Sequence, residues 1–171
     1  MKTLRQGIKT DMICQTLKAH RTTAENSPAA SAWTDCDGLV LIDSESSGDA
    51  LTLNADTKTI DIHKDGIYLF GGCVHVNNAT AGLFTGISVL SRVLKNGTTE
   101  AKCSQREFTK NIAAGGRDVL SFNGTDYLED GDSLVLQYYT DNANIDFINN
   151  PNFANNVAWS IWLTWCGNEV D

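Results

Sequence analysis

Residues 117–139 read RDVLSFNGTDYLEDGDSLVLQYY, and this stretch decides the fold class. Val119–Phe122 and Ser133–Tyr139 are rich in β-branched and aromatic residues, which is typical of strands. The residues between them are turn formers, among them Asn123, Gly124, Asp130 and Gly131. In the second segment one face is fully apolar, carrying Leu134, Leu136 and Tyr138, and the other is mixed. We therefore predict two strands joined by a short acidic turn.

The chain after residue 30 repeats this pattern of short apolar runs separated by polar turns. We predict further strands at Leu39–Ile42, Leu51–Leu53, Thr59–Ile62, Ile67–Val76, Gly86–Leu94, Thr99–Phe108 and Val157–Cys166. Asn96-Gly97 is a hairpin signal, and Gly71-Gly72 predicts a bend or bulge. The last strand has a heavy apolar face and belongs in the middle of a sheet. Because many short strands must close on themselves to protect their edges, the fold class is an all-β sandwich or barrel.

Composition limits the function classes. The chain has 171 residues, a formal charge of −8 and a pI near 4.7, which argues against a nucleic-acid partner. Five cysteines, an odd number without a C-x-x-C pair, are interpreted as reduced thiols. We find neither a secretory signal nor an 18-residue apolar run, so we expect cytosolic synthesis and no membrane partner.

The first 30 residues differ from the rest in charge. They carry a net +3, whereas the other 141 residues carry −11. Ser27, Pro28, Ala29 and Ala30 mark the boundary, so we predict an attachment arm at residues 1–30, extended or partly helical, and a jelly-roll domain at residues 31–171. The predicted anchoring residues are the basic and apolar side chains Lys2, Leu4, Arg5, Ile8, Lys9, Met12, Ile13, Leu17, Lys18 and Arg21.

Four motifs, in this order, resemble the jelly rolls of the tumour necrosis factor and complement globular-head families. They are Gly66–Phe70 (GIYLF), Val93–Gly97 (VLKNG), Leu128–Leu136 (LEDGDSLVL) and the aromatic C-terminal strand. The resemblance spans residues 32 to 167 and implies an antiparallel jelly-roll β-sandwich that forms a homotrimer. Trp159, Trp162 and Trp165 replace the usual C-terminal aromatic and glycine pattern, so the binding surfaces of the family are not carried over.

The sequence shows neither a catalytic nor a metal-binding motif, and we interpret the protein as non-enzymatic. The sequence lacks G-x-S-x-G and H-E-x-x-H, so we predict no catalytic residue, no cofactor and no metal ligand. The acidic run Asp126–Asp132 fails the EF-hand pattern. We interpret it as a solvated turn, with a looser calcium site as the alternative. His63 and His75 are interpreted as a solvated and a half-buried imidazole.

The expected function is that of a virion structural protein. Cytosolic synthesis, the charged arm and an Asn- and Thr-rich body favour a bacteriophage capsid decoration (cement) protein, made in the host bacterial cytoplasm and anchored to the major capsid protein by its arm. The alternative is the receptor-binding head of a head or tail fibre, with a host surface glycan as partner. A lectin or adhesin ranks third. For the homotrimer interface we predict the mixed strand faces that carry Val135, Gln137, Tyr139 and Trp162.

Overall fold

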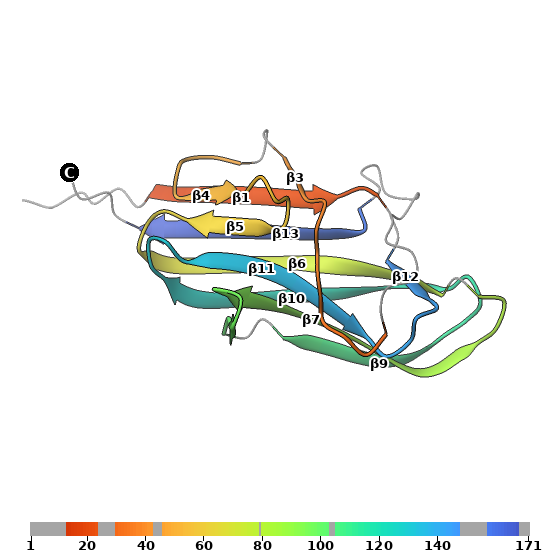
Figure 1. Cartoon of the computed structure of the whole chain (residues 1–171). Helices are drawn as coiled ribbons and strands as arrows, with labels where there is room; N and C mark the ends of the chain where they lie inside the picture. Colours follow the sequence, from red (N-terminus) through yellow and green to blue (C-terminus); the bar gives the residue numbers. More distant parts are fainter. Residues whose placement is uncertain are drawn as a thin grey trace, which may run out of the picture.

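The computed structural model describes residues 13–23, 30–42, 46–78, 80–102, 105–147 and 157–167. Strands are the regular structure within these ranges, and they form two antiparallel sheets. Figure 1 shows the sheets as two layers of an elongated sandwich whose long strands run along its length. The predicted all-β sandwich is confirmed.

The first sheet has the strand order β10-β6-β13-β1-β3, and β12 also pairs with β6. Its strands are β10 (Arg117–Leu128), β6 (Gly66–Asn78), β13 (Trp159–Gly167), β1 (Ile13–Arg21), β3 (Val40–Leu41) and β12 (Ile145–Phe147). The predicted central position of the C-terminal strand is confirmed, since β13 lies between β6 and β1.

The second sheet has the order β4-β5-β11-β7-β8, with β2 also paired to β11 and β9 to β7. Its strands are β4 (Leu51–Leu53), β5 (Thr59–Ile62), β11 (Ser133–Thr140), β7 (Phe84–Lys95), β8 (Thr99–Glu100), β2 (Thr34–Asp35) and β9 (Arg106–Ile112). Asn96 and Gly97 both have positive φ at the β7–β8 connection, as the Asn-Gly signal predicts.

The core lies between the sheets and is made by alternate residues of the long strands. Tyr138 of β11, Phe147 of β12 and Trp159 of β13 are fully buried in an aromatic cluster. The ring centroids of Tyr138 and Phe147 lie 4.1 Å apart, and those of Tyr138 and Trp159 lie 5.7 Å apart. Each such side chain contributes about 2–3 kcal/mol through burial. Because these contacts join the two sheets, the cluster fixes how the sheets lie on each other.

Two glycine predictions need correction. β10 continues through Asn123 and Gly124 without a turn, because Gly124 lets the strand pass close to Phe70, whose Cζ would lie 2.5 Å from an added Cβ. β6 pairs through Gly71 and Gly72 with both neighbours in unbroken register, so it has no bulge there. At Gly72 an added Cβ would lie 2.0 Å from the Ser160 carbonyl oxygen. At both positions the absence of a side chain lets the strand backbone lie close to its neighbours.

The predicted arm boundary at residue 30 is also wrong, because residues 13–21 form β1 within the jelly roll. β1 pairs with β13 over its whole length, from Ile13↔Gly167 to Arg21↔Trp159. Gln15, Leu17 and Ala19 are buried, which is the two-residue period of a strand. Gln15 obscures this period in the sequence. Its Oε1 is held inside by the backbone N–H groups of Asp49 and Ala50, at 3.0 and 2.7 Å.

Candidate functional site

The structure separates the ten predicted anchoring residues into two groups. Leu17 is 2% exposed and Arg21 pairs with Asp37 while its guanidinium lies 4.7 Å from the Trp159 ring centroid, so both stabilise the fold. Lys18 lies on the outer face of β1, opposite Trp162. Ile13 begins β1, and its side chain is not described. The remaining six, Lys2, Leu4, Arg5, Ile8, Lys9 and Met12, lie outside the described residues.

The four predicted interface residues do not lie together in one protomer. Trp162 is on the outer face of the first sheet, whereas Val135, Gln137 and Tyr139 are half-buried on the outer face of the second. Alternation along a strand shows which residues share a face, but it does not show which sheet the strand joins. The two groups therefore belong to opposite surfaces of the sandwich.

The central part of the outer face of the first sheet is nearly free of charge, and we call this part the neutral face. It comprises the outward residues of β10 (Val119, Ser121, Asn123, Thr125, Tyr127), β6 (Ile67, Leu69, Gly71, Cys73, His75), β13 (Ser160, Trp162, Thr164, Cys166) and β1 (Cys14, Thr16, Lys18, His20). Lys18 is the single Lys, Arg, Asp or Glu among these residues, and Arg117 of β10 and Asp146 of β12 add charge only at one end of the sheet, beside Asn77 of β6. Ile67 and Leu69 are 58% and 46% exposed, and Tyr127 is 52% exposed. Exposed apolar side chains gathered on one surface are typical of interaction sites, which makes this face the candidate site.

Trp162 gives the neutral face a flat aromatic centre. The register places it opposite Gly71 of β6 and Lys18 of β1. A Cβ on Gly71 would lie 2.7 Å from Cζ2 of the indole, so the ring is packed directly on the glycine backbone. The indole is 37% exposed. A large aromatic ring lying flat and accessible is a typical anchor of a protein–protein interface.

The outer face of the second sheet is polar by comparison, with a connected network across β2, β11 and β7. Asp35 accepts from Lys58 Nζ at 2.8 Å and from Gln137 Nε2 at 2.8 Å, and Gln137 Oε1 accepts from Arg92 Nε at 2.9 Å. The Arg92 guanidinium lies 4.0 Å from the centre of the Trp33 ring. These bonds lower the pKa of Asp35 and raise that of Lys58, against the desolvation of both groups. Each charged side chain of this network therefore already has a partner within it.

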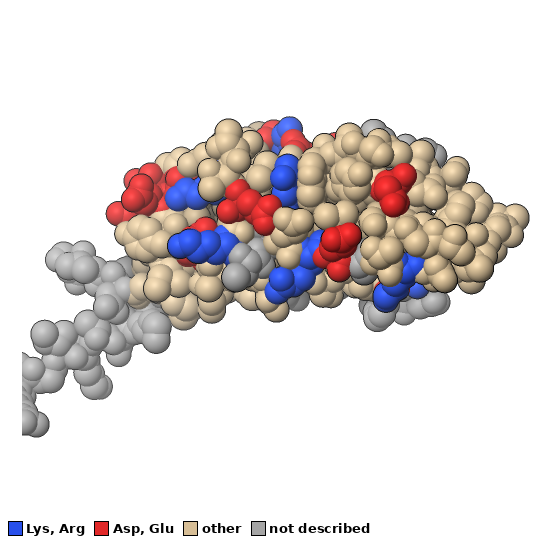
Figure 2. Space-filling view, turned by 90° about the horizontal axis from the view of Figure 1, so that it is seen from below, with Lys and Arg blue, Asp and Glu red and all other residues tan. Residues whose placement is uncertain are grey.

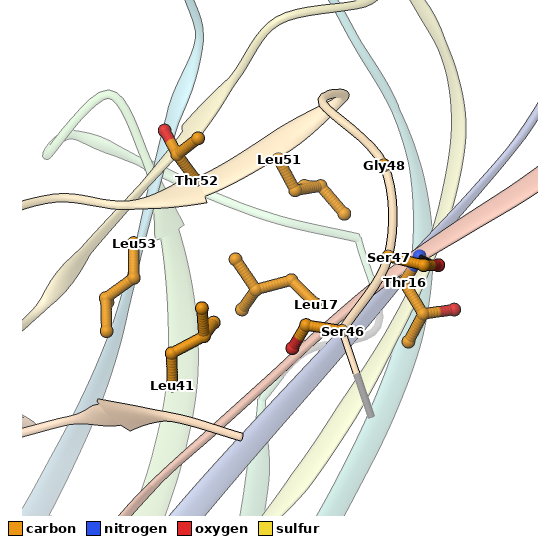
Figure 3. Close-up of a pocket in the computed structure, with 9 residues that line it drawn as sticks. All are labelled: Thr16, Leu17, Leu41, Ser46, Ser47, Gly48, Leu51, Thr52 and Leu53. Carbon is orange, nitrogen blue, oxygen red and sulfur yellow. Dashed lines mark hydrogen bonds between the residues drawn. The ribbon is translucent and has the colours of Figure 1, made fainter. Parts of the chain in front are cut away.

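Two hollows occur on the described surface. One, of about 440 Å³, lies on the outer face of the second sheet and is lined by Trp33, Ser88, Leu90, Gln105, Glu107, Tyr139 and Asp141. It combines two aromatic rings, 5.6 Å apart, with carboxylate and amide groups. The other, of about 350 Å³, lies where β1 and β3 approach β4, and Figure 3 shows Leu17, Leu41, Leu51 and Leu53 pointing toward one another inside it.

The acidic connection between β10 and β11 is a structural turn rather than a cluster of free carboxylates. Asp132 Oδ2 accepts from the Glu129 N–H at 2.8 Å and pairs with Lys95 Nζ at 2.6 Å, while its Oδ1 accepts from Asn96 Nδ2 at 2.7 Å. These bonds outweigh burial and lower the pKa of Asp132. Within the described ranges, no group of three or more His, Cys, Asp or Glu side chains is placed to hold a metal ion.

Cys73 and His75 form a contact that resembles a catalytic dyad. Cys73 Sγ lies 3.4 Å from His75 Nε2 and 3.3 Å from Ser160 Oγ. Burial raises the pKa of the Cys73 thiol and lowers the pKa of His75. Both shifts favour the neutral forms, whereas a nucleophilic cysteine requires a stabilised thiolate. The contact therefore favours packing over catalysis.

Charge elsewhere is mixed in sign. Figure 2 shows basic and acidic side chains interspersed over the face that it presents, without a region of one sign. Lys110–Asp118 at 2.6 Å and Lys102–Asp126 at 3.5 Å are pairs of this kind. In the described part of the chain, no helix is long and apolar enough to cross a membrane.

Comparisons with known proteins identify the fold. No family model matches the chain, and no curated protein matches its sequence. Among solved structures, Eiger TNF from S. frugiperda superposes with a TM-score of 0.58 at 12% identity, covering 94% of this chain and 96% of that one. Murine APRIL gives 0.55 at 14% identity, covering 90% and 99%. The chain therefore has a TNF-like jelly-roll fold. At such low identities the likeness shows the fold alone.

Proposed function

We propose that this protein is a non-enzymatic, homotrimeric structural protein of a bacteriophage virion, and specifically a capsid decoration protein. The observation that carries the trimer is the neutral face, where exposed Ile67, Leu69, Tyr127 and Trp162 surround small uncharged side chains. Burying this face against sister subunits removes apolar area from water without desolvating ion pairs. The trimer is also the assembly that the sequence resemblance implies.

The proposed trimer contact uses Trp162 from the predicted interface set. The other three predicted residues are not part of this contact, because they lie on the outer face of the second sheet, on the other side of the sandwich. They are Val135, Gln137 and Tyr139. In the proposed arrangement the neutral faces of three protomers surround the threefold axis, so their apolar centres are shared in a closed ring. The polar outer face of the second sheet then points away from the axis.

The trimer is tested by the mass of the purified protein in analytical ultracentrifugation. We expect three times the 18.6 kDa of one chain. Leu69→Glu places a charge at the neutral face and is expected to give monomers that keep their β-sheet circular dichroism. Leu83→Glu is the matched control, because Leu83 is equally an exposed leucine but precedes β7 outside the neutral face. A trimer that survives Leu69→Glu, or is lost in both variants, would contradict this interface.

The decoration role is proposed for residues 1–12, which precede β1. They contain Lys2, Arg5 and Lys9 against Asp11, a net charge of +2, together with Leu4, Ile8 and Met12. We expect full-length protein to bind undecorated capsids and a variant starting at residue 13 to lose that binding while remaining a trimer. The deletion must end there, because removing residues 13–21 would remove β1. Capsid binding by the shortened trimer would refute the anchoring role and leave the trimer proposal intact.

The second candidate is a receptor-binding head, and the hollow at Trp33 and Tyr139 favours it. Aromatic faces stack on the C–H face of a pyranose ring, and planar carboxylate and amide groups bind its hydroxyls. The lining Gln105, Glu107 and Asp141 offer such groups. A glycan array tests this candidate: binding lost in Trp33→Ala and kept in Lys58→Ala, outside the hollow, would favour it, and no bound glycan would dispose of it.

A further inference from the structure

Cys14 and Cys166 face each other across the β1–β13 pair. They are the directly opposed residues in the register, and both belong to the neutral face, with Cys14 exposed and Cys166 half-buried. The chain brings them together from sequence positions that are far apart. Because they occupy neighbouring strands rather than one loop, sequence spacing gives no sign of the pair.

The backbone hydrogen bonds show which type of pair this is. Thr16 and Lys18 direct their N–H and C=O groups away from β13, to Ser47, Ser46 and Ile42. Peptide groups alternate along a strand, so Cys14, with the same parity, also directs its groups away from β13. Cys14 and Cys166 are therefore a non-hydrogen-bonded pair. In such pairs the Cα atoms lie about 4.5 Å apart and the side chains are at their closest.

This spacing falls within the Cα separations of about 4.4–6.8 Å that disulfides span. The next pair on the same face shows that side chains do meet here, since Thr16 Oγ1 lies 3.0 Å from Thr164 Oγ1. The neighbouring Cys14 thiol, together with burial, raises the pKa of Cys166. We propose that Cys14 and Cys166 form an intramolecular cross-strand disulfide when the protein meets a small-molecule disulfide oxidant.

The reaction is a pair of thiol–disulfide exchanges. The more exposed Cys14, as the thiolate, attacks one sulfur of the oxidant, forms a mixed disulfide and releases one thiol. The Cys166 thiolate then attacks Cys14 Sγ and releases the second thiol. Two protein thiols lose two electrons and two protons, and the oxidant is reduced to two thiols. The product ties the start of β1 to the last strand of the described chain.

The other cysteines in the described part of the chain are poorly placed to form a disulfide. Cys36 is fully buried, and Cys73 is opposed by Ser121 and Ser160 in the register, so neither has a cysteine facing it across a strand pair. A bond at Cys14–Cys166 would also carry mechanical load from residues 1–12 into β13. That consequence rests on the proposed attachment role, whereas the bond itself does not.

The test uses purified full-length protein, as the wild type and as the Leu69→Glu variant that is expected to be monomeric, incubated with oxidised glutathione. The variant is included because the proposed trimer would cover the neutral face that carries both cysteines. We expect the intact mass to fall by two hydrogens, the titratable thiols to fall by two, and peptide mapping to find the Cys14–Cys166 link. The oxidised protein should melt roughly 5–15 °C higher than the reduced protein, from the usual effect of a disulfide on a chain of this size. Phenylarsine oxide, which bridges paired thiols, should bind at one equivalent and compete with oxidation.

Variants decide between this pair and other outcomes. Cys166→Ser should stop at a stable mixed disulfide between Cys14 and glutathione, and Cys73→Ser should oxidise as the wild type does. An unchanged mass of the Leu69→Glu variant, a link to another cysteine, or a chain-to-chain disulfide on a non-reducing gel would overturn the proposal. These readouts do not depend on capsid binding, so failure of the disulfide is separable from failure of the decoration role.

Discussion

Asp132 holds together the acidic turn at the centre of the 117–139 stretch, and replacing it with asparagine tests that role. The side chain is 10% exposed, and its oxygens accept from the Glu129 N–H and Asn96 Nδ2 and pair with Lys95 Nζ. Asn96 Oδ1 in turn accepts from the Ser133 N–H at 2.8 Å. The β10–β11 turn is thereby joined to the β7–β8 hairpin.

Asp132→Asn removes the charge and one acceptor while keeping the shape. Hydrogen bonds to a charged group contribute about 1.5–3 kcal/mol, so we expect a loss near 2 kcal/mol in the free energy of unfolding. For a chain of this length that corresponds to a melting midpoint roughly 4–8 °C lower at pH 7. Differential scanning calorimetry at one fixed protein concentration measures it, because oligomers melt in a concentration-dependent way.

The pH dependence of this loss has a definite sign. The pKa of Asp132 is lowered in the folded state, so its stabilisation is complete above the unfolded pKa near 3.9 and disappears as the pH falls through the folded value. The gap between wild type and variant should be equal at pH 7 and pH 5, and smaller at pH 3. Asp130→Asn, an exposed carboxyl in the same turn, is the control. A gap no larger than the control's, or one that widens in acid, would refute this reasoning.

Three further changes test the packing and polar contacts of the first sheet. Gly72→Ala should cost about 1–3 kcal/mol or more in urea unfolding, because its Cβ would meet Ser160 O at 2.0 Å, whereas Gly82→Ala, with open space around it, should be neutral. Gln15→Ala should cost about 1–3 kcal/mol, because it leaves the buried Ala50 N–H without its acceptor; an unchanged urea midpoint would contradict this. Burial lowers the pKa of His75, so the free energy of unfolding of the wild type should decrease as the pH falls below about 6.5. His75→Gln should make the free energy of unfolding less dependent on pH between pH 7 and 5, and an equal pH dependence in both proteins would exclude His75 as its cause.

The sequence predicts the fold well where one face of a strand is strongly apolar. The alternation of Leu134, Leu136 and Tyr138, and that of Trp159, Ile161, Leu163 and Trp165, is found in the core as expected. It predicts β1 badly, because Gln15 and Lys18 interrupt the pattern and the hydrogen bonds that accommodate Gln15 come from the distant residues Asp49 and Ala50. Here a tertiary contact overrides the local composition.

The candidate surface is harder to predict than the core. The hydroxyl side chains of this surface look like ordinary turn or surface residues in the sequence. Only the pairing of β10, β6 and β13 brings them together on one uncharged surface; they are Ser121, Thr125, Ser160 and Thr164. The four predicted interface residues divide between the sheets for the same reason. A period of two assigns residues to faces, but long-range pairing decides which faces become neighbours.

The two outer faces differ in a way that bears on assembly. On the second sheet the charged side chains already bind one another, in a network that runs from Lys58 through Asp35 and Gln137 to Arg92. Covering this face with another protein would therefore gain little free energy. The neutral face has no such network, and its apolar groups gain only when another surface covers them. It also exists only after β1 has paired with β13, near opposite ends of the described chain. Because its central residues Trp162 and Lys18 come from these two strands, the complete surface is a property of the finished fold, and association through it must follow closure of the sandwich.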